Sequence, residues 1–138
     1  MGLVFADRDV KTEVLSAAAT LDVTDTGKVF ILDAATGKTV TLPSLAYGLN
    51  FKFVVGAAFA TDNWIVKSAE GDNINGSIAD MGTTVAVVVA GAEDQINFVA
   101  SAETIGDYIE VIADEANSQW IVTGMCAANG GITATDPS

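Results

Sequence analysis

The stretch Asp94–Gly124, DQINFVASAETIGDYIEVIADEANSQWIVTG, decides the fold class of this chain. Its Ile, Val, Phe, Tyr and Trp residues form short runs of strand length, and Gly106 and the polar segment 114–118 interrupt them. The last two runs are separated only by that polar segment, which is typical of a β-hairpin. The predicted strands are Asp94–Val99, Asp107–Ala113 and Gln119–Thr123.

The same pattern extends upstream, where turn signals recur about every 8–12 residues, as in sandwiches and jelly rolls. Asp33–Gly37 has the length and the glycine of a hairpin loop, and the Asn-Gly pair within Gly71–Gly76 favours a tight turn. The sequence therefore predicts an all-β fold, an antiparallel, jelly-roll-like β-sandwich. The additional predicted strands are Lys28–Leu32, Lys38–Leu42, Asn50–Val55, Asn63–Ser68 and Thr83–Ala90.

The chain has 138 residues, which is the size of one domain with its own core. Residues 21–126 contain the predicted strands and form the predicted sandwich. Residues 1–20 mix charge with Ala and Thr, and residues 127–138 are small and polar. We expect the first segment to be an extended N-terminal arm and the second a C-terminal tail.

Two predicted strands are apolar on both faces, which indicates self-association. Val85–Ala90 has no polar face, so we expect a central strand covered on both sides, and Tyr108–Ala113 has only Glu110 as a polar residue. A small domain has little material to cover two such strands, so the sequence predicts a homo-oligomer that buries the surplus apolar surface. The predicted interface residues are Val85, Val87, Val89, Tyr108, Ile112 and Trp120.

The composition argues against enzyme chemistry. The chain has no His, and its one cysteine, Cys126, lacks the base that activates a thiol, so we expect a buried, idle side chain. No phosphate-binding glycine motif occurs. Asp107 and Asp114 lie at opposite ends of one strand, too far apart for a catalytic pair. We expect no catalytic residue and no cofactor.

Calcium binding by the acidic loops remains an open alternative, because calcium takes several loop oxygens as ligands. Neither candidate loop matches the EF-hand pattern, and Asn-rich turns are common without metal. The candidate ligands are Asp72, Asn73 and Asn75 in one loop and Asp114, Glu115 and Asn117 in the other.

Charge is distributed unevenly along the chain, whose net charge is −12. All six basic residues lie in the first 67 positions beside seven acids, whereas the remaining 71 residues hold eleven acids and no base. Such a chain repels nucleic acid and anionic membranes, and no apolar run approaches the ~20 residues of a membrane helix. Either the acids only provide solubility, or a near-neutral end docks and an acidic end faces water.

Several sequence segments of this chain resemble segments of the small β-rich structural proteins of tailed bacteriophages. The resemblance is in particular to the capsid decoration proteins, also called cement or head-fibre proteins. The N-terminal Phe5-Ala-Asp-Arg8 and the following Lys11 are similar to the starts of some phage virion proteins. The segments that carry the resemblance are Thr26–Ala35, Thr39–Pro43, Gly71–Gly76, Asp94–Val99, Gly106–Asp114 and Trp120–Gly124.

The resemblance implies a β-sandwich or β-tulip subunit that is made in the host cytoplasm and resides on the virion surface. It implies a homotrimer that bridges neighbouring major capsid proteins and so stabilises the shell, with no catalytic or cofactor residue. The alternative is a phage fibre or adhesin module that binds a host-surface receptor or glycan. The N-terminal arm is suited to dock on the capsid through Leu3, Val4, Phe5, Arg8 and Lys11.

Overall fold

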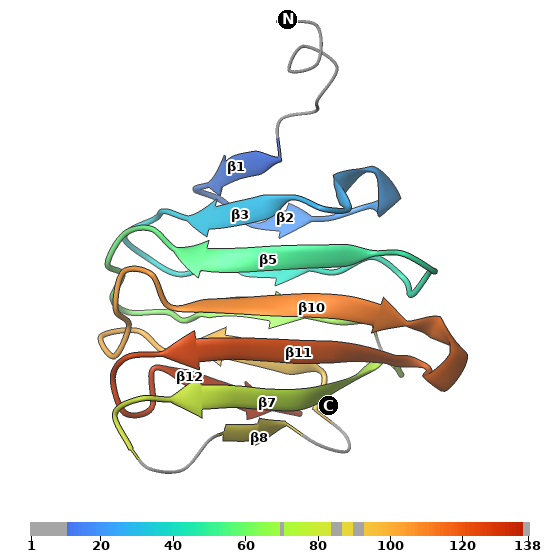
Figure 1. The fold of residues 1–138 in the computed structure, drawn as a ribbon. Helices are drawn as coiled ribbons and strands as arrows, with labels where there is room; N and C mark the ends of the chain where they lie inside the picture. Colours follow the sequence, from blue (N-terminus) through green and yellow to red (C-terminus); the bar gives the residue numbers. More distant parts are fainter. Residues whose placement is uncertain (1–10, 70, 84–86, 90–92, 137–138) are drawn as a thin grey trace, which may run out of the picture.

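The structure, a computed structural model, describes residues 11–69, 71–83, 87–89 and 93–136 (Figure 1). These residues confirm the all-β sandwich: strands form two sheets, and short 3₁₀ turns at η1 (Val23–Asp25) and η2 (Glu115–Asn117) are the helical elements among them. The seven-stranded sheet contains, in order, β1 (Thr12–Leu15), β3 (Val29–Leu32), β5 (Asn50–Val55), β10 (Tyr108–Asp114), β11 (Gln119–Cys126), β7 (Asn73–Asp80) and β8 (Val87–Val89). The five-stranded sheet contains β12 (Ile132–Thr135), β9 (Gln95–Phe98), β6 (Trp64–Lys67), β4 (Thr39–Thr41) and β2 (Ala19–Thr20).

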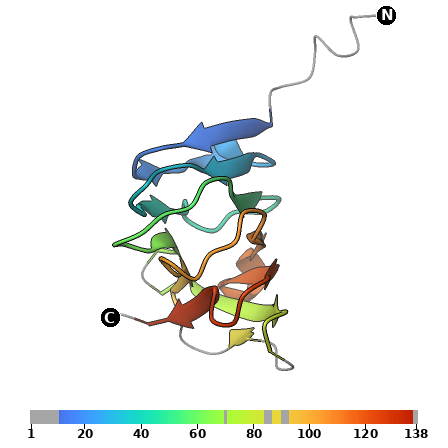
Figure 2. The same ribbon diagram turned by 90° about the vertical axis from the view of Figure 1, so that its left-hand side faces the viewer.

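The sheets are mixed, which corrects the prediction of an antiparallel sandwich. From β1 to β6 the chain alternates between the two sheets, so that β1, β3 and β5 are parallel neighbours in one and β2, β4 and β6 in the other. This part of the chain therefore winds through three stacked turns (Figures 1 and 2). Antiparallel pairing is confined to β10 with β5 and β11, β9 with β6 and β12, and β7 with β8 among the described strands.

The hairpin near the C-terminus is confirmed. β10 and β11 pair antiparallel along their length, and Asp114 lies opposite Gln119 where the 3₁₀ turn η2 joins them. Ser118 has a left-handed backbone with φ of 53°, which closes the loop. β10 also pairs with β5, so the hairpin lies in the middle of the seven-stranded sheet.

The hairpin predicted over residues 28–42 is wrong, because β3 and β4 belong to opposite sheets. The glycine that suggested a hairpin turn, Gly37, is needed for a different reason. A Cβ atom at Gly37 would lie 2.2 Å from the carbonyl carbon of Asn63, so only glycine lets the two loops approach this closely.

The tight turn predicted at the Asn75-Gly76 pair is also wrong, since both residues lie within β7. Gly76 has a φ of 146°, and a Cβ there would lie 2.0 Å from the carbonyl oxygen of Val122 on the neighbouring strand β11. Glycine is therefore required inside the sheet, where two backbones come close.

The two end segments contain strands, which corrects their description as arm and tail. The chain joins the sheets as early as β1 and β2, and β12 lies at the edge of the five-stranded sheet. The buried carboxylate of Asp107 accepts a hydrogen bond from the Ala127 N–H at 3.0 Å, and that of Asp80 accepts one from Gly130 N–H at 3.0 Å. These two bonds fix the connection from β11 to β12. Residues 1–10 and 137–138 lie outside the described residues.

The core lies between the sheets and is rich in aromatic side chains. Phe30 and Phe53 occupy matching positions on β3 and β5, and their rings stack with centroids 5.5 Å apart. Phe51 packs against Trp120 at 6.0 Å. Stacking the same residue type in successive turns lets parallel strands bury a continuous apolar row.

The strand predicted over Thr83–Ala90 is present in part. Its described portion, β8, pairs only with β7 at the edge of the seven-stranded sheet, whereas a central strand was predicted. Residues 84–86 and 90–92 lie outside the described residues.

Candidate functional site

The outer side of the seven-stranded sheet carries a row of apolar side chains that the register aligns across five neighbouring strands (front sheet in Figure 1). A second apolar contact lies further along the sheet, where Ile112 of β10 is directly opposite Ile121 of β11. Ile31, Val54 and Tyr108 are partly covered by their neighbours, whereas Val14, Ile112, Ile121 and Met125 are exposed, Val14 by 58% and Ile112 by 51%. We name this surface the apolar face; it consists of Val14, Ile31, Val54, Tyr108, Met125, Ile112 and Ile121.

A single ion pair lies between the two parts of the apolar face. The Lys52 ammonium is 3.8 Å from the Glu110 carboxylate and 4.6 Å from the centre of the Tyr108 ring. Together with Asp114, Lys52 and Glu110 are the charged residues that point outward from the described strands of this sheet. One cation and two anions give this surface a net charge of −1, in a chain whose net charge is −12.

The predicted interface residues separate into three groups. Tyr108 and Ile112 lie on the apolar face. Trp120 does not, and its prediction is wrong, because its side chain is fully buried against Phe51 in the core. The backbone of Val87 and Val89 is in edge strand β8, and Val85 lies outside the described residues.

Sequence reasoning missed most of the apolar face. Ile121 had a usable signal, because three consecutive apolar residues at 120–122 in a predicted strand mean that both sides of that strand are apolar. Val14 had none, since its strand was expected to be an arm. The remaining members that were missed are Ile31, Val54 and Met125.

Most of the predicted capsid-docking residues, Leu3, Val4, Phe5 and Arg8, lie outside the described residues. Lys11 is described and is exposed immediately before β1. The uneven charge of the sequence becomes a spatial difference in the structure. Strands β1 to β6 lie together at one end of both sheets, and five of the six basic residues, Lys11, Lys28, Lys38, Lys52 and Lys67, lie in or immediately before this part of the chain.

The acidic loops considered for calcium are organised by hydrogen bonds among their own side chains. The carboxylate of Asp114 accepts bonds of 2.8 Å from the Asn117 and Gln119 amides, and these bonds, led by that from Gln119, lower the pKa of Asp114. Gln119 in turn accepts a 2.8 Å bond from Asn75. Candidates from both loops are thus joined across the ends of β7, β10 and β11. No cluster of three or more His, Cys, Asp or Glu suited to a metal occurs within the described residues.

The single thiol is buried, as the sequence predicted. Cys126 ends β11, and burial raises the pKa of its thiol, which keeps it protonated at neutral pH. Asp80 and Asp107 lie near it and raise the pKa further.

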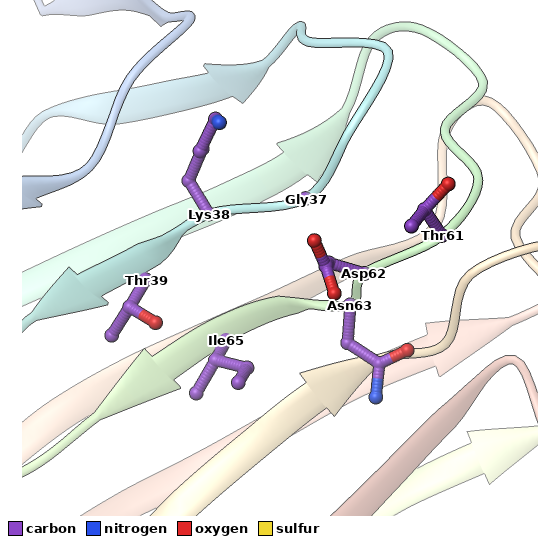
Figure 3. Close-up of a pocket in the computed structure, with 7 residues that line it drawn as sticks. All are labelled: Gly37, Lys38, Thr39, Thr61, Asp62, Asn63 and Ile65. Atoms are coloured by element: carbon purple, nitrogen blue, oxygen red, sulfur yellow. The ribbon is translucent and has the colours of Figure 1, made fainter.

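A polar pocket of about 500 Å³ opens where β4 and β6 begin, in the five-stranded sheet (Figure 3). Side chains from two loops line it: Lys38 comes from the loop before β4, and Thr61 and Asp62 from the loop before β6. Thr39 and Ile65, which are opposite each other in the register, lie on the strands themselves. The sequence did not predict this pocket, because its loops are brought together only by the crossing between sheets.

No protein-family model, no curated protein and no solved structure matches this chain. None of the described elements is a helix of the length and hydropathy needed to cross a membrane.

Proposed function

We propose that this chain is a structural virion protein that decorates the capsid of a tailed bacteriophage and stabilises it. It acts as a homotrimer bound to the major capsid protein on the outside of the shell. The assignment to a phage rests on the resemblance of the strand and turn segments to those of phage capsid decoration proteins. The observation that carries the structural role is the apolar face, a sheet surface with exposed Val, Ile and Met side chains and almost no net charge.

The occupant of the apolar face in this proposal is another copy of the same chain. Copies that carry a net charge of −12 repel one another over most of their surface. The apolar face adds little to this repulsion, because the charge of Lys52 is offset by Glu110. A hollow of about 180 Å³ beside this ion pair, lined in part by Val29 and Asn50, gives an incoming side chain room to insert.

We assign the capsid contact to a different surface from the apolar face, namely the end of the sandwich where the basic residues lie. Lys11 and Lys28 lie at this end, immediately before β1 and β3, whereas the charged residues of the last 71 positions are all acids. A near-neutral end can approach a protein shell, and an acidic end remains hydrated.

Sedimentation equilibrium tests the self-association. At about 10 μM, a concentration at which a stable interface is occupied, the wild type should sediment as a trimer. The double variant Ile112→Glu with Ile121→Glu should sediment as a folded monomer, because each subunit then buries two unpaired carboxylates. The matched control is Thr20→Glu with Thr41→Glu, a cross-strand pair on the outer side of the five-stranded sheet, which should remain trimeric. A monomeric wild type, or a trimer unaffected by the first variant, contradicts the proposed interface.

Particle stability tests the capsid role separately. Phage particles that lack this chain should lose DNA at lower temperature and after milder osmotic shock than wild-type particles, and added purified protein should restore them. Equal stability of the two kinds of particle contradicts the cementing role. The alternative, a fibre module that binds a receptor, predicts instead that particles without the chain are stable but attach poorly to cells.

A further inference from the structure

The polar pocket at the start of β4 and β6 is held by contacts that leave its lining side chains available. Gly37 N–H donates to the Asp62 carbonyl at 3.1 Å, and Ile65 N–H donates to the Lys38 carbonyl at 2.9 Å, which joins the two loops through their backbones. The Asn63 side-chain oxygen accepts a 2.9 Å bond from Ala100 N–H and so anchors the second loop to a third one. The walls of the pocket are therefore built before any ligand arrives.

One residue of this wall has a costly backbone conformation. Thr61 has a φ of +80°, in the left-handed region where a β-branched residue is a genuine outlier. Strain of this kind persists where the surrounding structure enforces it, and it is concentrated at binding and catalytic sites. Thr61 is one of the residues that line the pocket (Figure 3).

The pocket lining contains one positive and one negative side chain that do not form an ion pair with each other. Lys38 contributes one cation and Asp62 one anion, and neither forms an ion pair with any described residue. The lining consequently has no net charge, although the chain as a whole is strongly acidic. The negative charge of the whole chain repels an anionic ligand, and the opposite charges of Lys38 and Asp62 offset each other, so the lining itself has no net preference for a charged ligand.

The chemistry of the lining matches a neutral ligand with many hydroxyl groups. Lys38 donates hydrogen bonds, Asp62 accepts them, and the hydroxyls of Thr39 and Thr61 can do both. Ile65 is the one sizeable apolar side chain among the lining residues and is half-buried beside Thr39. It offers a small apolar surface for the C–H side of a ring, whereas a larger apolar ligand would find little to contact.

We propose that this pocket binds a neutral saccharide, with Asp62 and Lys38 hydrogen-bonding the sugar hydroxyls and Ile65 contacting the ring. The proposal does not depend on the capsid role or on the oligomeric state. The pocket lies on the other sheet from the apolar face, so binding and self-association can occur together.

NMR titration of the ¹⁵N-labelled full chain tests this proposal. The probes are methyl α-glucoside, methyl β-galactoside and N-acetylglucosamine, each raised to about 50 mM so that a site with a Kd of about 1 mM becomes nearly saturated. At least one sugar should produce saturable shifts of the Lys38, Thr61, Asp62 and Ile65 amide signals. No saturable shift with any of the three sugars overturns the proposal.

Two variants separate a real site from weak surface contact. Asp62→Ala removes an exposed carboxylate from the pocket and should raise Kd about tenfold, the usual effect of losing one hydrogen bond to a charged group. Asp33→Ala removes an exposed carboxylate from the loop before β4 that does not line the pocket, and should leave Kd unchanged. Equal Kd values for Asp62→Ala and the wild type overturn the proposal. The same is true if phosphate or glycine shifts these signals while the sugars do not.

Discussion

The outer sides of the two sheets differ although both face solvent. The seven-stranded sheet presents the apolar face, whereas the five-stranded sheet presents mainly hydroxyl and amide side chains, with Ile65 and Lys67 among them. We name its polar residues the polar face: Thr39, Thr41, Lys67, Gln95, Asn97, Thr133 and Thr135. On the polar face the side chains satisfy one another. Asn97 donates to the hydroxyls of Thr133 and Thr135 at 3.2 and 3.1 Å and accepts a bond from Gln95 at 3.0 Å.

The comparison teaches where a partner gains most. A partner on the polar face would have to replace hydrogen bonds that already exist, whereas a partner on the apolar face would remove Ile and Val side chains from water. This is why the proposed self-association uses the seven-stranded sheet and why the matched control variant lies on the five-stranded one.

The largest expected effect separates the apolar face from the core directly behind it. Trp120→Ala should destabilise the folded chain by about 3–5 kcal/mol, because a fully buried indole is lost and a cavity remains. Ile112→Ala, on the outward side of the same hairpin, should change the stability of the monomer by less than about 0.5 kcal/mol. Urea unfolding at a concentration low enough for the chain to be monomeric measures both values. Similar losses for the two variants would show that the apolar face is already covered within one chain.

The second prediction tests how the polar face is held together. Asn97→Ala should destabilise the chain by about 1–2 kcal/mol, because the hydrogen bonds that join β9 to edge strand β12 are lost. Thr123→Ala, at an exposed position on the outer side of the seven-stranded sheet, should have an effect below about 0.5 kcal/mol. Thermal unfolding of both variants provides the measurement. An unchanged melting temperature for Asn97→Ala would mean that these hydrogen bonds do not contribute to the stability of the chain.

The third prediction concerns the strained residue at the pocket in the five-stranded sheet. Thr61→Gly should stabilise the chain by about 1 kcal/mol, since glycine adopts a φ of +80° without steric conflict. Thr39→Gly, in the extended strand β4, should instead destabilise it by about 1 kcal/mol. Chemical denaturation distinguishes the two signs. Destabilisation by both variants would argue against strain at Thr61.

The smallest expected effect is a pH dependence at the end of the seven-stranded sheet. Hydrogen bonds from Gln119 and Asn117 hold the pKa of Asp114 below its ordinary value. Their contribution is therefore present above about pH 4 and is lost as the pH falls through the lowered pKa. Wild type should be slightly more stable than Asp114→Asn at pH 7, and this difference should vanish at low pH. A difference in stability that is independent of pH would contradict this assignment.

The sequence predicted elements well where local pattern determines them. The hairpin of β10 and β11 was predicted within a few residues, because a short polar loop between two apolar runs has few other structures. The parallel turns were not predicted, since β1 and β2 are short and pair with strands about twenty residues away along the chain. Gly37 and Gly76 suggested turns but serve close backbone contact, and a sequence does not distinguish these two uses of glycine. Trp120 was misplaced because a strand with apolar residues on both sides does not reveal which side faces the core.

The winding of the first six strands links chain length to the height of the whole domain. Each turn adds one strand to each sheet, and Thr12, Val29 and Lys52 mark equivalent places in successive turns. An insertion of about twenty residues between β4 and β5 can therefore lengthen both sheets together by ~4.8 Å, the spacing of neighbouring strands, while the hairpin keeps its own pairing. Duplication of a single turn can therefore enlarge such a domain by one strand in each sheet.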